Sequence, residues 1–227
     1  MERQNFHKEL ENLKLTVYKM AASARKSLDS ACKAYLERDD ELAQSIIDGD
    51  REINKIELDI DRQSLRLLAL EQPMARDLRM IVGIMRISND LERIADQCVN
   101  IAERTIFLCQ HSPIGPVPAL ESLIGSTRRM FSMAVTAFRD MDSDTARKIP
   151  AMDDEADEYT MQVLKGLIKV MAASSSGFEK RVLKMRRSIQ TIIISRCLER
   201  IADLSTNIAE HVAFIVEGVN IKHQNKL

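Results

Sequence analysis

A repeated thirteen-residue motif constrains the fold of this chain more than any other feature of its sequence. Residues 91–103 read LERIADQCVNIAE and residues 198–210 read LERIADLSTNIAE, so the two segments differ at only three of thirteen positions. A second match pairs AYLERDDELAQSIIDGDREIN, which begins at Ala34, with AFRDMDSDTARKIPAMDDEAD, which begins at Ala137. Two matches in the same order predict that the chain is an internal duplication of one structural unit.

The segment between the copies, HSPIGPVP from His111 to Pro118, contains three prolines and one glycine. Such a segment cannot continue a helix, so we divide the chain there into a first repeat, residues 1–112, and a second repeat, residues 113–227. The matched segments are 103 residues apart in one case and 107 in the other. We expect the four extra residues near Ala172 to Phe178, where AASSSGF is typical of a loop.

The composition favours helices, because the 227 residues include only seven glycines and five prolines and no tryptophan. Pro73 suits a first helical turn, Ser143 is a reasonable N-cap, and Pro150 predicts a kink or a later helix start. Breaks in the pattern divide each repeat into three helical stretches. The expected helices span 2–36, 40–70, 73–110, 119–140, 143–171 and 178–218.

Apolar residues in the third and sixth stretches follow the alternating spacing of three and four residues that is typical of bundle helices. In the third stretch this seam runs from Ile84 through Leu91 to Leu108, and its copy runs from Ile194 to Ile215. The sequence therefore predicts an all-α protein made of two tandem three-helix bundles.

Acidic residues of the repeated motif form a stripe that lies roughly 150° from the apolar seam at about 100° per residue, so we expect it to face away from the core. Carboxylates four residues apart repel each other unless a cation or a basic side chain compensates. Asn100 and Asn207 lie beside the stripes. The stripe residues are Glu92, Asp96 and Glu103 in the first repeat and Glu199, Asp203 and Glu210 in the second.

The preceding helices carry a second acidic element, with Asp50 and Glu52 in the first repeat and Asp153, Glu155 and Asp157 in the second. If the two helices of each repeat lie side by side, their oxygens could bind one ion. An all-oxygen site suits Mg, Mn, Ca or, with several carboxylates, an iron cluster, and zinc is disfavoured because no His or Cys is repeated in both copies of the motif. The alternative is a solvated charged face in which Arg93 and Arg200 serve as local partners.

Several of these elements together resemble the PhoU family of phosphate-transport regulators, over the whole chain except the tail after Gly218. They are DLR at 77–79, LERIAD followed by NIAE in both repeats, and the acidic stretches GDREIN and MDDEAD. The family's E/DxxxD signature maps onto Glu92 with Asp96 and onto Glu199 with Asp203. Many members have glycine where this chain has Ala95 and Ala202, a substitution of one small residue by another.

The resemblance implies negative control of the phosphate regulon, by coupling the ATPase subunit of the phosphate ABC transporter to a phosphate-sensing histidine kinase. It also implies a homodimer that meets the membrane only indirectly, through those partners. Because some members bind metal at the signature, we expect iron or another divalent cation such as Mn, Mg, Zn or Ni. The expected ligands are Glu92, Asp96, Glu199, Asp203, Asp50 and Asp153, with Asn100, Glu103, Asn207, Glu210 and Asp157 as additional metal or partner contacts.

Other classes of function have little support in the sequence. The formal charge of −1 and the few aromatic residues disfavour nucleic-acid binding, and no run of about 18 apolar residues predicts a membrane span, so we expect a cytoplasmic protein. Four scattered cysteines suit a reducing compartment, and we interpret them as core residues. Neither a Gly-rich phosphate loop nor a His-based catalytic arrangement occurs, so we expect no enzyme.

Two alternatives to a metal-dependent regulator stay open. The first is a metal-free helical adaptor, and the second is a carboxylate-bridged di-iron oxidoreductase, although that class uses Glu-x-x-His motifs inside a four-helix core. The densest basic stretch, FEKRVLKMRR from Phe178 to Arg187, is interpreted as a solvated helix start, with docking of an acidic partner as the alternative.

Overall fold

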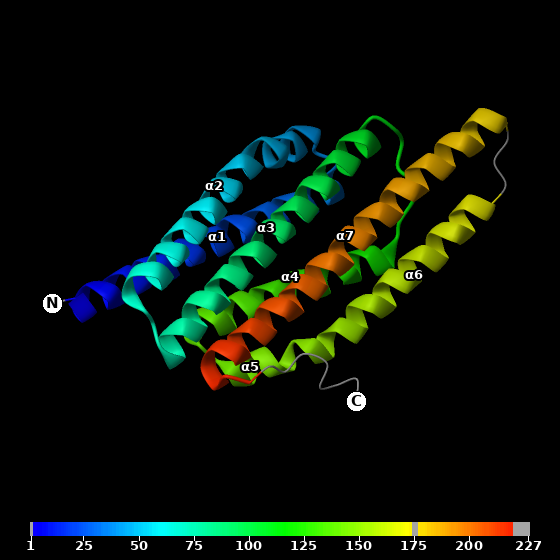
Figure 1. The fold of residues 1–227 in the computed structure, drawn as a ribbon. Helices are drawn as coiled ribbons and strands as arrows, with labels where there is room; N and C mark the ends of the chain where they lie inside the picture. Colours follow the sequence, from blue (N-terminus) through cyan, green and yellow to red (C-terminus); the bar gives the residue numbers. More distant parts are fainter. Residues whose placement is uncertain (1, 174–176, 220–227) are drawn as a thin grey trace.

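The computed structural model describes residues 2–173 and 177–219, and every regular element in these ranges is helical (Figure 1). The predicted all-α class is therefore confirmed. A single 3₁₀ turn, Pro150–Met152, joins two of the helices. The α-helices are α1 (Glu2–Glu37), α2 (Asp40–Glu71), α3 (Ala75–Cys109), α4 (Pro118–Asp140), α5 (Ser143–Lys148), α6 (Asp153–Ala172) and α7 (Phe178–Glu217).

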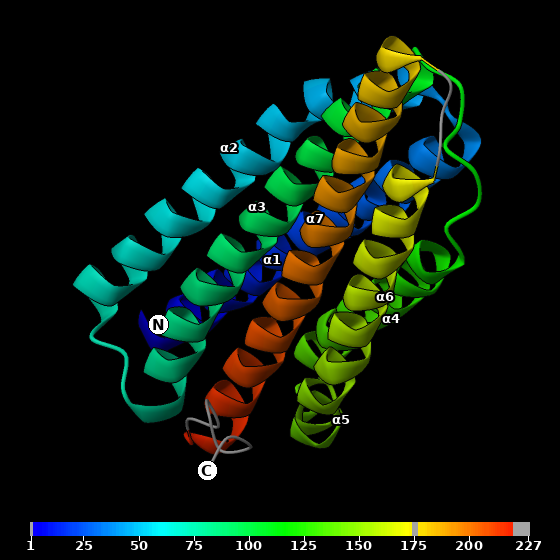
Figure 2. The same cartoon turned by 90° about the vertical axis from the view of Figure 1, so that its right-hand side faces the viewer.

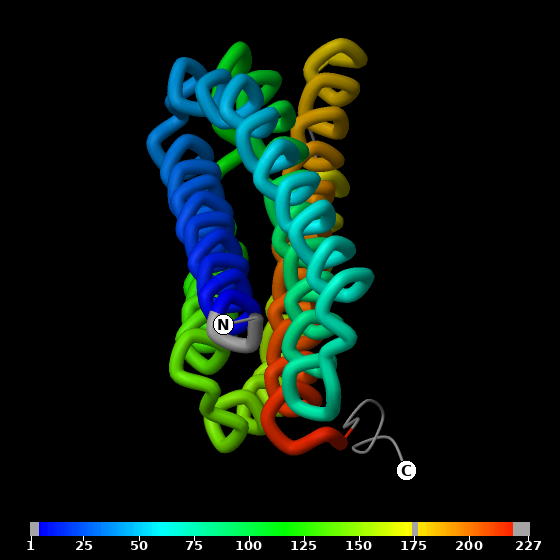
Figure 3. The backbone as a smooth tube through the Cα atoms, turned by 60° about the vertical axis from the view of Figure 1, so that its left-hand side comes forward, coloured from blue at the N-terminus to red at the C-terminus, as the bar shows by residue number. Residues whose placement is uncertain are grey.

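The helices form two layers. In one layer α2, α3, α7 and α6 lie side by side in that order, with α3 and α7 running antiparallel at the centre (Figures 1 and 2). The other layer holds α1, which packs on α2 and α3, and α4, which packs on α6 and α7; Figure 3 shows the layers nearly edge-on. We call the side of the four-helix layer that α1 and α4 do not cover the outer face.

The apolar seams predicted for the third helix of each repeat lie in the core between the layers. Ile84 and Leu91 on α3 are 0 % exposed, and Ile194 and Ile215 on α7 are each 1 % exposed. Burial of these seams against the second layer is the main stabilising contribution to such a bundle, because each fully buried aliphatic side chain contributes about 1.5–3 kcal/mol.

A glycine lets α3 and α7 approach closely. A Cβ atom added at Gly83 would lie 2.3 Å from Cγ1 of Ile215, so no larger residue fits without movement of the buried Ile215 side chain. Two turns further along α3, Oδ2 of Asp90 lies 3.2 Å from Nε2 of His211 on α7. These two contacts fix the register of the central helix pair.

The structure corrects two details at the helix ends. Ser143 is not the N-cap of α5, because the Asp142 carboxylate takes that role and accepts a hydrogen bond of 3.0 Å from the Thr145 amide. Pro73 lies before α3 rather than in its first turn, since Met74 is the N-cap. The interruption predicted at Pro150 is confirmed, because a 3₁₀ turn there separates α5 from α6.

Three further predictions concern local features. The loop expected near Ala172 to Phe178 includes residues 174–176, which lie outside the described residues. Three of the four cysteines are buried, as predicted, but Cys109 at the end of α3 is only partly buried, and all four are free thiols. Within the described ranges, no helix is long and apolar enough to cross a membrane.

Candidate functional site

The acidic stripe of the first repeat lies where α2 runs beside α3. Glu92 is partly buried, whereas Asp96, which lies one turn further along α3, is more exposed. Burial raises the pKa of the Glu92 carboxyl above its ordinary value, and the nearby charges of Asp96, Glu57 and Asp50 raise it further, while Arg93 opposes them. The pKa of Asp96 is also raised, first by burial and then by Asp50. The structure thus places Asp50 of α2 beside both carboxylates of the α3 motif.

Two oxygens of this cluster have no hydrogen-bond donor among the described residues. Oδ2 of Asp50 accepts a bond of 2.9 Å from the Asn54 amide, but Oδ1 of Asp50 and Oδ1 of Asn54 are buried and unsatisfied. A buried acceptor without a donor costs about 1–3 kcal/mol, so a bound cation would stabilise this arrangement. The donor set is entirely oxygen, which fits a hard cation such as Mg, Mn or Ca, or iron.

Glu57 also belongs to this cluster, although the sequence did not predict it. Burial raises the pKa of its carboxyl, and the charge of Asp61 one turn later raises it further. The signal that could have found it is spacing, since Glu57 follows Asp50 by seven residues and therefore shares its helix face. Glu52, which the sequence grouped with Asp50, instead lies on an exposed face beside Lys55, at 3.6 Å.

The cluster continues into a groove of about 650 Å³ where α2, α3 and α7 meet. Glu57 and Asp61 line its α2 side, and the Asp90–His211 contact lies across its α3–α7 side. Glu210, predicted as an additional contact, also lines this groove. The groove is acidic, so it favours a cation or a basic group.

The stripe of the second repeat has different neighbours. Glu199 forms an ion pair with Arg196, whose Nη1 lies 2.8 and 2.6 Å from the two carboxylate oxygens. Asp203 is exposed one turn later, and Asp153 is partly buried in the first turn of α6. Asp157 is exposed on the next turn. The duplicated motif therefore presents one stripe whose neighbours are mainly acidic and one in which an arginine neutralises the first carboxylate.

The remaining predicted contacts lie at the margins of the stripes. Asn100 donates a hydrogen bond of 2.9 Å to the Asp96 carbonyl, and Glu103 lies 2.9 Å from Arg104 in an ion pair. Asn207 is partly buried on α7. In the two described ranges, no three His, Cys, Asp or Glu side chains converge as ligands of a single ion. The carboxylates of the first repeat are close enough to interact electrostatically but do not form a closed coordination shell.

Comparison with known proteins identifies the family of this chain. The PhoU domain matches the chain twice, over residues 17–105 and again over residues 120–212. The chain belongs to the PhoU family. The resemblance noted in the sequence is thereby confirmed, and each match contains one copy of the acidic motif.

Relatives in the PhoU family match nearly the whole chain. A protein of Aquifex aeolicus named "Phosphate-specific transport system accessory protein PhoU homolog" is 36 % identical over 96 % of this chain and 96 % of its own length. The Escherichia coli protein named "Phosphate-specific transport system accessory protein PhoU" is 30 % identical, with 96 % of this chain and 88 % of that protein covered.

Solved PhoU structures share the fold. The crystal structure of PhoU from Pseudomonas aeruginosa aligns with a TM-score of 0.87 at 31 % identity, covering 94 % of this chain and 100 % of that one. The phosphate transport system regulatory protein PhoU from Streptococcus pneumoniae aligns with a TM-score of 0.84 at 27 % identity, covering 96 % of this chain and 99 % of that one. The predicted PhoU-like duplicated helical fold is confirmed.

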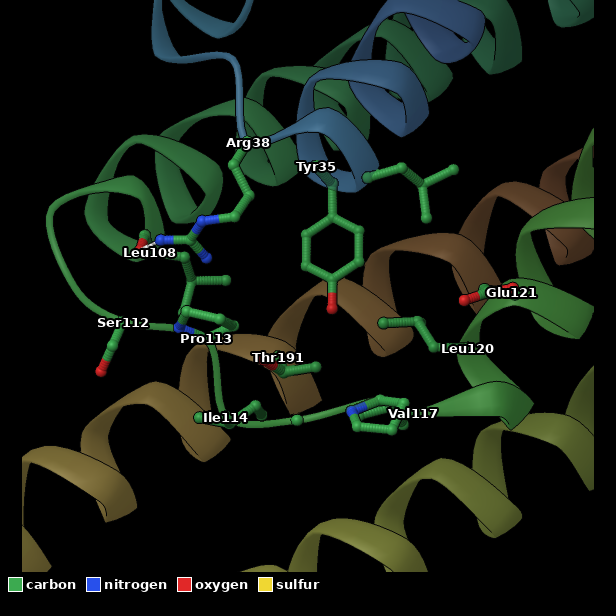
Figure 4. A pocket seen from close by; sticks show the side chains of 13 residues that line it. Tyr35, Arg38, Leu108, Ser112, Pro113, Ile114, Val117, Leu120, Glu121 and Thr191 are labelled. Carbon is green, nitrogen blue, oxygen red and sulfur yellow. Dashed lines mark hydrogen bonds between the residues drawn. The ribbon is translucent and has the colours of Figure 1, made fainter.

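A second cavity of this PhoU-family protein has a structural role. It measures about 170 Å³ and lies beneath the segment that links the repeats, away from the acidic stripes (Figure 4). Arg38 points toward the end of α3 and donates hydrogen bonds to the carbonyls of Leu108, at 2.6 Å, and His111. Burial raises the pKa of the Tyr35 phenol, which faces Thr191 across the cavity. Arg38 thus ties the linker to the first repeat, and Arg187 of α7 ties it to the second by donating a hydrogen bond of 2.9 Å to the Ser112 hydroxyl.

Proposed function

We propose that this protein is an accessory regulator of phosphate uptake, acting on the cytoplasmic side of a phosphate ABC transporter. Membership of the PhoU family and the names of the relatives from Aquifex aeolicus and Escherichia coli support this role. The structural observation that carries the proposal is the placement of both acidic motifs on the central pair α3 and α7 of the four-helix layer. A long, regular face of this kind suits contact with other proteins.

The regulatory part of the proposal is negative control of phosphate-starvation genes. In phosphate-rich medium the protein would contact the ATPase subunit of the transporter and a phosphate-sensing histidine kinase, and so keep the kinase from activating those genes. We expect a homodimer that reaches the membrane only through these partners. The function is signal coupling rather than catalysis.

Metal binding at the acidic stripes is a further part of the proposal. In the first repeat Glu92, Asp96, Asp50 and Glu57 would hold the ion, and in the second Glu199, Asp203 and Asp153 would do so. Iron, Mn, Mg, Zn and Ni are the candidates. The ion would supply positive charge that offsets carboxylate repulsion, and it would join α2 to α3 in the first repeat and α6 to α7 in the second.

A metal-free adaptor is the second candidate, and one observation favours it. Arg196 already neutralises Glu199, so the second stripe is stabilised by an ion pair without a cation. Elemental analysis of protein purified without chelator separates the two candidates. Metal in the wild-type protein that is lost from a Glu92→Ala/Asp96→Ala variant supports a metal-dependent regulator, whereas metal-free protein that still regulates supports the adaptor.

Gene deletion tests the regulatory role. In a deletion strain grown with excess phosphate, a reporter of phosphate-starvation genes should be expressed, and the purified protein should retain the transporter ATPase in a pull-down. Restoring the gene should restore repression, which controls for effects on neighbouring genes. Normal repression in the deletion strain, together with no contact with the ATPase or the kinase, would exclude this function.

A further inference from the structure

The hairpin of α6 and α7 exposes large apolar side chains on the outer face. Met161 and Ile168 of α6 are 46 % and 50 % exposed, and Met185 and Ile189 of α7 are 51 % and 43 % exposed. We call these four residues the α6–α7 patch. Contiguous exposed apolar surface of this kind marks an interaction site more often than a passive surface.

Helix periodicity places the four side chains in two adjacent rows. Met161 and Ile168 are separated by seven residues, or two turns, and therefore share one side of α6. Met185 precedes Asp203 by 18 residues, or five turns, so it lies on the side of α7 that carries the acidic stripe. Because α6 and α7 pack against each other, we expect the two rows to form a seam of about three turns.

The chain segment that contains Ile168 and Met185 is strongly basic. Residues 165–187 contain seven basic residues and one acidic residue, although the whole chain has a charge of −1. The matching stretch of the first repeat, residues 62–80, contains four basic and two acidic residues. The basic residues of this segment are Lys165, Lys169, Lys180, Arg181, Lys184, Arg186 and Arg187. Three of them also have partners within the protein, because Lys184 donates to the Ala173 carbonyl, Arg186 lies over the Phe107 ring and Arg187 donates to the Ser112 hydroxyl.

In the first repeat, the basic residue at one matching position forms an ion pair with a neighbouring helix. Nη2 of Arg66 on α2 lies 3.3 Å from Oε1 of Glu9 on α1, so the N-terminal part of α1 supplies a carboxylate there. Lys169 stands at the matching position of α6 and is exposed. Among the described helices, α4 has 23 residues against 36 in α1 and begins at Pro118, so it has no turn at the position that matches Glu9.

We infer that the α6–α7 patch binds an amphipathic α-helix of a partner protein, with apolar residues at spacings of three and four and with acidic residues on its flanks. This mode buries the apolar edge of the incoming helix in the seam between two helices and pairs its carboxylates with exposed basic residues such as Lys165 and Arg181. The inference rests on the proposed role in coupling the transporter to the kinase, and it assigns that role a binding surface.

Charge also argues for a helix rather than an anionic membrane as the occupant. Glu199 and Asp203 continue the Met185 row toward the centre of the outer face. A flat anionic membrane covering the patch would therefore meet the carboxylates of the acidic stripe, which it would repel. A helix of about three turns covers the patch without reaching the stripe.

The first repeat offers a matched control surface. Leu65 and Leu78 occupy the positions of Ile168 and Met185, and they are 58 % and 41 % exposed. The seam beside them is acidic, because Glu57 and Asp61 stand where α6 has Thr160 and Leu164. An acidic helix should therefore distinguish the two ends of the molecule.

The test uses a fluorescein-labelled synthetic helix with leucines at spacings of three and four and glutamates on both flanks, titrated with the full-length protein by fluorescence anisotropy. The glutamate peptide should bind. Ile168→Ser/Met185→Ser should weaken that binding by about tenfold or more, because it removes two apolar contacts, while Leu65→Ser/Leu78→Ser should change it less than about twofold. Circular dichroism checks that both variants keep the fold.

Four results would overturn the inference: no binding of the glutamate peptide, equal binding of a lysine-flanked peptide, equal loss in the two variants, or preferential binding of the patch to phosphatidylglycerol vesicles. A reporter assay keeps the inference separate from the proposed function. If gene deletion derepresses phosphate-starvation genes but Ile168→Ser/Met185→Ser does not, the protein regulates without this surface. If deletion has no effect, the regulatory role fails, and the peptide titration still decides whether the surface binds acidic helices.

Discussion

The Asp90 carboxylate of α3 lies 3.2 Å from Nε2 of His211 on α7, and both side chains are less than 10 % exposed. The contact therefore joins the two repeats at the edge of the acidic groove. Asp90→Ala should lower the free energy of unfolding by about 1–3 kcal/mol, because it removes a buried carboxylate that faces the His211 ring and also lies 3.6 Å from Arg93. Urea denaturation measures this loss.

A matched control and a double-mutant cycle sharpen this prediction. Asp96→Ala removes an exposed carboxylate of the same helix and should change stability by less than about 0.5 kcal/mol. The Asp90→Ala/His211→Ala double variant should lose less than the sum of the single variants, because the two residues share one interaction. Additive losses would show that the contact contributes nothing to stability.

The close approach of α3 and α7 predicts an unusual effect of alanine at a helical glycine. Gly83→Ala should destabilise the protein by about 1–3 kcal/mol, because its Cβ would lie 2.3 Å from Cγ1 and 2.5 Å from Cδ1 of the buried Ile215. Gly166→Ala is the control, since a Cβ there meets no atom within 4 Å. That variant should gain up to about 1 kcal/mol from helix propensity. Thermal unfolding of both variants tests the difference.

The helical framework was predictable because it depends on local periodicity. The apolar spacing through Ile84 and Leu91 predicts a helix, and the structure has α3 there with both side chains buried. The prolines of the linker predict a break, and the structure has no helix in the described residues between α3 and α4. The N-cap of α5 was not predictable from the sequence, because Asp142 and Ser143 are both good capping residues and only the backbone conformation distinguishes them.

Contacts between helices were less predictable. Asp90 and His211 are not repeated, since Cys197 and Arg104 stand at the matching positions, so duplication gave no signal for their pairing. Arg196 likewise replaces Asn89 of the first repeat, and its ion pair with Glu199 makes the two stripes unequal. Such differences arise from side chains outside the repeated motif.

The acidic cluster predicts a pH dependence with a definite sign. The pKa values of Glu92 and Asp96 are raised in the folded protein, so their contribution to stability is greatest below the ordinary carboxyl pKa of about 4 and is lost as pH rises through the raised values. At pH 7 without metal, Asp96→Asn should therefore stabilise the protein by about 0.2–0.5 kcal/mol, because it removes a like-charge pair.

Two measurements check the sign. The gain from Asp96→Asn should shrink as the pH of denaturation experiments is lowered toward about 4, where the wild-type carboxyls become protonated. NMR titration of the side-chain carboxyl carbons should give a lower pKa for Glu92 in this variant than in the wild type, since Asp96 is one cause of the shift. A variant less stable than the wild type at pH 7 in the absence of metal would contradict the prediction.

The unequal stripes predict unequal metal binding. If a divalent cation binds, the first repeat should bind it more tightly, because Glu92 and Asp96 have acidic neighbours whereas Glu199 is already paired with Arg196. Titration calorimetry with Mn²⁺ should therefore show a larger loss of affinity in Glu92→Gln/Asp96→Asn than in Glu199→Gln/Asp203→Asn.

Arg196→Asn, which copies Asn89 of the first repeat, should strengthen binding at the second stripe by up to roughly fivefold, because an exposed ion pair contributes about 0.2–1 kcal/mol. Arg200→Asn removes a neighbouring arginine and controls for the general loss of positive charge. Equal gains in Arg196→Asn and Arg200→Asn would show that overall charge, and not the Arg196–Glu199 pair, limits the second stripe.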